Sequence, residues 1–93
     1  MSIEDRLAAQ REVLRDQAEE PIRLRKLQAA ILEFGVLLID SDKLSRHTQS
    51  VVNDAVHGVA GSIHTRFQEM YEKEYLKAAF MLIGIYEAIF GGQ

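Results

Sequence analysis

The chain has 93 residues, contains no cysteine, and carries a formal net charge of −3 at neutral pH. The missing cysteines exclude disulfide bonds and thiolate metal sites, and the acidic balance argues against nucleic-acid binding, which needs a basic face. The hydrophobic fraction is 47%, with six glycines and one proline, which is a helical rather than a turn-rich β composition. We therefore expect a single all-α domain over residues 1–93. The amino-terminal residues are charged and amphipathic, unlike those of a signal peptide. We therefore expect the protein to be cytoplasmic.

The first expected helix covers about residues 3–19, within a more polar amino-terminal segment of residues 1–20. Ser2 is a suitable N-cap for it, with acidic residues in the first turn. The apolar stripe is thin, and Arg11 lies within it. A helix with so little apolar surface is marginal on its own, so we expect it to lie against other helices. The stripe consists of Ile3, Leu7, Leu14 and Ala18.

The second expected helix covers about residues 22–39. Pro21 either starts this helix or kinks a longer one, because proline is tolerated only in a first helical turn. Apolar residues recur at alternating spacings of three and four, as at the a and d positions of a coiled coil. Near residue 39 the helix is apolar almost all round, so we expect it to be buried on several sides. A short strand over residues 34–39 is the competing interpretation. The a/d positions are Leu24, Leu27, Ile31, Phe34 and Leu38.

Two further helical patterns follow, over about residues 43–65 and 67–90. Residues 40–42 break the preceding run and can supply an N-cap, and Gly91 and Gly92 should end the last helix. No strong breaker separates the two patterns, so they predict either two helices or one rod of about 70 Å, which would demand a second copy. Gly58 and Gly61 each cost about 1 kcal/mol in a helix interior. We expect either a close backbone approach or a helix break there.

Metal binding and catalysis have weak support in the sequence. Asp54 and His57 are spaced like half of a carboxylate–histidine pair in a helical bundle. His64 would lie about 10 Å further along the same face, too far to bind the same metal ion, and Glu69 or Glu72 would have to complete the site. No nucleophile elbow, phosphate-binding loop or dinucleotide fingerprint occurs. We expect no cofactor and no enzymatic activity, and interpret these residues as a solvated polar stripe.

Nucleic-acid contact is the other alternative. Arg23, Arg25 and Lys26 form the only basic cluster, which Arg46 could join in the fold. Acidic residues lie one turn away, and the aromatic residues lie at the far end of the chain, so bases would have no stacking platform. We interpret the cluster as the solvated start of a helix.

A membrane span is not expected. The apolar stretch of residues 76–90 is shorter than the roughly 20 residues that cross a bilayer, and it contains Lys77 and Glu87. A core helix or an oligomer helix is the favoured interpretation.

Two of the expected helices are apolar around more than half their circumference, which is more than a helix in a four-helix monomer needs. Surplus apolar surface is usually covered by another protein, and aromatic residues and methionine are favoured in interface cores. We therefore expect a non-enzymatic interaction module that forms a homo-oligomer, in the simplest case a dimer, and serves as an adaptor, inhibitor, chaperone-like or assembly protein. The expected interface residues are Leu24, Leu27, Ile31, Phe34, Leu38, Tyr71, Tyr75, Leu82, Ile85, Tyr86 and Ile89.

Overall fold

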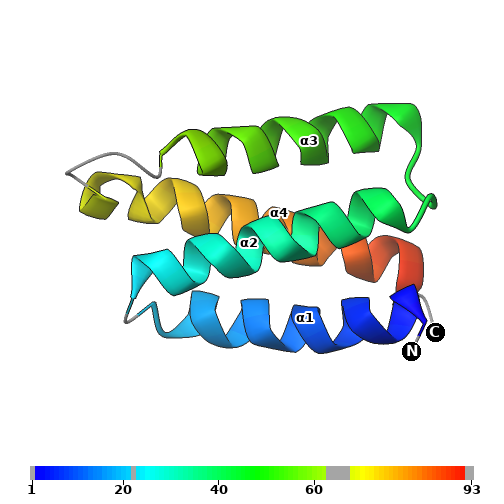
Figure 1. Cartoon of the computed structure of the whole chain (residues 1–93), viewed down its shortest axis with the longest axis horizontal. Helices are drawn as coiled ribbons and strands as arrows, with labels where there is room; N and C mark the ends of the chain where they lie inside the picture. Colours follow the sequence, from blue (N-terminus) through cyan, green and yellow to red (C-terminus); the bar gives the residue numbers. More distant parts are fainter. Residues whose placement is uncertain (1, 22, 63–67, 92–93) are drawn as a thin grey trace.

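The protein is a bundle of four α-helices in a computed structural model, which describes residues 2–21, 23–62 and 68–91 (Figure 1). Successive helices run in opposite directions, and residues 34–39 are helical, so the strand interpretation is wrong. No strand occurs within these described ranges. The all-α bundle expected from the sequence is confirmed. Its elements are α1 (Ile3–Glu19), α2 (Leu24–Asp40), α3 (Arg46–Gly61), the short 3-10 helix η1 (Gln68–Tyr71) and α4 (Glu72–Phe90).

Helix α2 is the central element and packs against the three other α-helices. In Figure 1 it lies in front of α4, with α1 along one side and α3 along the other. This position explains its wide apolar surface. The second to fifth of its a/d residues are fully buried in the core of the chain, while the first, Leu24, is half-buried. The fully buried ones are Leu27, Ile31, Phe34 and Leu38.

The amino-terminal caps agree with the sequence at α1 and differ from it at α3. The Ser2 hydroxyl accepts a hydrogen bond from the backbone N–H of Asp5 at 3.1 Å, as expected of an N-cap. At α3 the cap is Ser45, whose hydroxyl accepts from the backbone N–H of Thr48 at 3.2 Å. The expected cap within residues 40–42 is wrong because Asp40 is the last residue of α2 and the next two residues form a turn, with Asp42 at a φ of 59°. Helix α3 accordingly begins three residues later than expected.

The other helix ends decide the alternatives that the sequence left open. Pro21 lies in the linker between α1 and α2, so it neither starts α2 nor kinks a longer helix. Helix α3 ends at Gly61, and α4 returns alongside α2, so the prediction of one continuous rod is wrong. The need for a second copy that followed from such a rod is therefore removed. Residues 63–65 of the expected third helix lie outside the described residues. Helix α4 ends at Phe90, where the N–H of Gly91 donates to the carbonyl of Glu87 at 3.0 Å.

Gly35 determines how closely α2 and α3 approach. A Cβ built on this residue would overlap Cγ2 of Val56, and it would also touch Leu82 of α4 at 3.8 Å. Glycine is the one residue that leaves this space to Val56. The close approach of α3 to α2 therefore depends on a missing side chain in the second half of α2.

Candidate functional site

A small polar network lies buried where α2, α4 and the end of α3 meet. The side-chain amide of Gln28 donates to the carbonyl of Val59 at 2.9 Å and to the hydroxyl of Tyr75 at 3.3 Å. The Ser62 hydroxyl donates to the same carbonyl at 2.7 Å and shares a hydrogen bond with the Tyr75 hydroxyl. All three polar side chains are buried. Since they satisfy one another, the network is a joint that fixes α2, α3 and α4 relative to one another.

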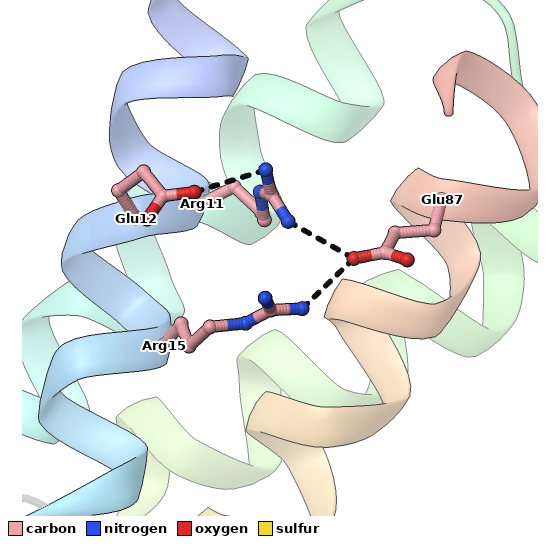
Figure 2. A network of polar contacts seen from close by, with 4 residues as sticks. All are labelled: Arg11, Glu12, Arg15 and Glu87. Carbon is pink, nitrogen blue, oxygen red and sulfur yellow. Dashed lines mark hydrogen bonds and ion pairs between the residues drawn. The ribbon is translucent and has the colours of Figure 1, made fainter. Parts of the chain in front are cut away.

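An ionic cluster connects α1 to the last turn of α4, as Figure 2 shows. Arg11 and Arg15 both donate to Oε1 of Glu87, at 3.0 and 2.9 Å, and Arg11 also contacts Glu12 at 2.9 Å. The guanidinium of Arg11 lies 5.8 Å from the ring centre of Tyr86. The arginine within the apolar stripe of α1 is thus explained: it reaches across to α4. The cluster is partly exposed, so its contribution to stability is modest.

A groove of about 470 Å³ separates α3 from α4. On the α3 side it is lined by small residues, Ala55 and Gly58, together with Val59. Among the described residues, a Cβ on Gly58 would meet no heavy atom within 4 Å, so no described part of the chain closes this wall. The α4 side is apolar and aromatic, with two charged residues. It consists of Tyr71 at the end of η1 and of Glu74, Tyr75, Lys77, Ala78 and Met81 of α4.

The apolar side of this groove continues along α4 beyond the groove itself. Ala78, Met81, Ile85 and Ile89 follow one another at helical spacing, and none of them is fully buried. Ile89 is 38% exposed, as is Tyr71 near the other end of the same face. Among the neighbouring helix pairs, α3 and α4 pack most loosely. The result is an apolar face of α4 that α3 covers only in part.

A second groove, of about 610 Å³, runs between α1 and α2. Half of its lining is polar: Arg6, Gln10, Glu33 and Asp40, with Ala9, Leu32, Val36 and Leu37 making up the rest. The α1–α2 groove is larger in volume than the α3–α4 groove, but the two helices that form it pack closely against each other. The lining of the α3–α4 groove is the more apolar of the two.

The residues of the metal-site alternative are only partly described. Asp54 and His57 are exposed on α3, whereas His64 and the side chain of Glu69 lie outside the described residues. Within the described part of the chain, no group of three or more histidine, aspartate or glutamate residues is arranged to hold a metal ion.

The fold separates Arg46 from the other three basic residues of the nucleic-acid alternative. Arg23, Arg25 and Lys26 are exposed near the start of α2, and Arg46 is exposed at the start of α3. These two helix starts lie at opposite ends of the bundle (Figure 1). Arg46 therefore does not extend the cluster as the sequence analysis had allowed.

The eleven expected interface residues divide into three groups. Six are buried inside the chain's own core: Leu27, Ile31, Phe34, Leu38, Tyr75 and Leu82. Leu24, Ile85 and Tyr86 are half-buried, and Tyr71 and Ile89 are exposed. The six buried side chains are covered by the chain's own helices, so a contact with another protein would have to use apolar side chains that remain accessible, such as those on α4. The most exposed large apolar side chains of η1 and α4 are Met70 of η1 and Phe80 of α4, which are not among the eleven expected interface residues.

No helix in the described ranges is long and apolar enough to cross a membrane. Comparison with known proteins adds no assignment: no family model matches the chain, and no significantly similar curated protein or solved structure is found.

Proposed function

We propose that the protein is a non-enzymatic interaction module whose α3–α4 groove receives an amphipathic helix of a protein partner. The observation that carries the proposal is the open wall of small residues on α3 opposite the incompletely covered apolar face of α4. A helix laid between them would bury that face and complete the packing, as in other helix-in-groove complexes. An adaptor, inhibitor, chaperone-like or assembly role would all use this binding mode.

The glycine at position 58 supports this occupant. An interior glycine costs about 1 kcal/mol relative to alanine, and within the described chain nothing approaches Gly58 closely enough to account for it. A partner helix passing close to α3 would need that space. Ala55, one turn earlier on the same wall, also has a small side chain that would let a partner helix approach α3 closely.

Self-association belongs to the proposal as well, but it needs a surface other than the six core residues named above. We also place the protein in the cytoplasm, because a chain without cysteine is suited to a reducing compartment.

Replacing Gly58 with glutamine tests the proposal, because the new side chain would project into open groove space without a clash in the chain. Tagged wild-type and Gly58→Gln proteins are purified from the native host, and the co-purifying protein is identified by mass spectrometry. A synthetic peptide covering its amphipathic helix is then titrated by calorimetry. We expect at least a tenfold weaker affinity for the variant, since glutamine both fills and polarises the groove.

The matched control is Gly84→Gln, which introduces the same side chain at another exposed helical glycine with open space around it. Gly84 does not line the groove, so peptide affinity should stay at the wild-type value. A partner that binds the Gly58 variant as tightly as wild type, or a nucleic acid as the co-purifying species, would contradict the groove assignment.

A further inference from the structure

Helix α4 presents a second exposed face, which shares only Lys77 with the groove. We call it the outer strip of α4 and define it as Lys73, Lys77, Phe80, Gly84, Glu87 and Ala88, which recur at helical spacing and are all exposed. Phe80 is the largest side chain of the strip and is 52% exposed. None of these residues except Lys77 lines the groove.

We propose that the outer strip binds a second copy of this chain, with the two α4 helices packed antiparallel about a two-fold axis level with Leu82. This inference deepens the proposed self-association by giving it a surface and a register. In an antiparallel two-fold pair, residues equally far from the axis face one another across the interface.

Shape complementarity sets this register. Phe80 and Gly84 lie two residues on either side of Leu82, so the ring of one copy meets the glycine of the other. A Cβ on Gly84 would have no heavy atom within 4 Å in the described part of the chain, so the space above this glycine is open there. A large apolar side chain and a matching gap thus occur on one self-complementary face.

The charges of the strip fit the same register. Lys77 and Glu87 lie five residues on either side of Leu82, so each lysine of the dimer faces a glutamate of the other copy. Lys77 forms no ion pair with another residue of the described ranges. Glu87 holds both arginines of α1 through Oε1, and its side chain is 46% exposed, which leaves it accessible to a lysine from outside.

Lys73 supports the antiparallel direction independently. It stands in the first turn of α4, where the partial positive charge of the helix end disfavours a lysine. In the proposed pair it faces Gly91 of the other copy, at the carboxyl end of that copy's α4. A cation next to a helix carboxyl end is favourable.

The first experiment is sedimentation equilibrium of the full chain from low to high micromolar concentration. One helix pair buries an area at or below the roughly 1,200 Å² of the smallest stable complexes, so we expect a concentration-dependent monomer–dimer equilibrium. Gly84→Gln should weaken dimerisation at least tenfold by filling the space for Phe80. Its melting temperature at low concentration should not fall, because glutamine is a better helix former than glycine.

Charge reversal tests the electrostatic part. Lys77→Glu places like charges opposite each other twice in the dimer and should also weaken association measurably. Lys26→Glu makes the same charge change at an exposed position of α2, outside the outer strip, and serves as the control that should dimerise like wild type. A chain that stays monomeric at high micromolar concentration, or a dimer that resists Gly84→Gln, would overturn the proposal.

The register is tested by cross-linking, for which the absence of native cysteine is convenient. Lys77→Cys and Ala88→Cys are prepared as separate proteins and treated with a short bismaleimide, alone and as an equal mixture. Equivalent residues of the two copies are about 15 Å apart along the axis for position 77 and about 18 Å for position 88, so neither alone should cross-link. The mixture should cross-link, because position 77 of one copy lies about 1.5 Å from the level of position 88 of the other. Cross-linking of either protein by itself would contradict the antiparallel register.

The proposals for the outer strip and for the groove can be disproved independently of each other. Gly84→Gln removes the dimer and leaves helix-peptide binding intact, whereas Gly58→Gln removes peptide binding and leaves the dimer intact. Loss of both in one variant would show that the two surfaces are not separate.

Discussion

Val56 occupies the space that a side chain on Gly35 would need, and this relationship sets the packing of α3 on α2. We expect Gly35→Ala to destabilise the protein by about 1–3 kcal/mol, although alanine is the better helix former, because the β-branched Val56 cannot move aside cheaply. Chemical denaturation followed by circular dichroism measures the change. Combining it with Val56→Ala should recover part of the loss, and a fully additive double variant would contradict the assigned contact.

An exposed glycine should behave in the opposite way. Gly58 has open space where a Cβ would lie, so Gly58→Ala should stabilise the free protein by about 1 kcal/mol through helix propensity. For a domain of this size that corresponds to a rise in melting temperature of about 4–8 °C. A fall in the melting temperature of the monomer would mean that something in the chain already uses the space at Gly58.

The buried network predicts a cost for removing one hydroxyl. Tyr75→Phe takes away a hydrogen-bond partner of both Gln28 and Ser62, while each keeps its contact with the carbonyl of Val59. We expect a loss of about 1–2 kcal/mol in unfolding free energy, since the remaining polar groups stay buried with fewer partners. Tyr71→Phe removes the hydroxyl of an exposed tyrosine one turn earlier, and should be neutral within about 0.5 kcal/mol.

The ionic cluster between α1 and α4 predicts a small, salt-dependent effect. Glu87→Gln removes the charge that Arg11 and Arg15 share, and should cost about 0.5–1 kcal/mol at low ionic strength. The loss should shrink in high salt, because exposed charges are screened. Denaturation curves at low and high salt measure it. An effect that is unchanged by salt would show that Glu87 acts through packing instead.

The helices and most of the core were predictable from the sequence because periodicity reports which face of a helix is buried. Leu27, Ile31, Phe34 and Leu38 follow a heptad spacing, and all four are in the core. The same spacing could not say what covers them, since the chain's own helices and a second copy bury apolar surface equally well. For that reason the spacing alone is equally compatible with an interface between copies, whereas in the structure these residues are buried by the chain's own helices.

Other features could be located only after folding. Arg11 interrupts an apolar stripe, which signals a special role, but its partner lies far along the chain. Gln28 stands one turn after Leu24 and three residues before Ile31, a position that predicts burial, yet Ser62 and Tyr75 come from other helices. The sequence around Gly35 does not indicate that Val56 of α3 lies against it. The outer strip of α4 could not be located either, because it depends on which face of α4 the other helices leave exposed.

Site-specific photo-cross-linking in the native host can establish whether a partner helix lies in the α3–α4 groove. A photoreactive amino acid replaces Ala55, which lines the groove, and, as a control, Asn53, which is exposed on α3 and does not line it. If a partner helix occupies the groove, we expect a discrete protein adduct from position 55 alone, with the cross-linked peptide lying in an amphipathic helix of the partner. No adduct from position 55, or the same adducts from both positions, would contradict it.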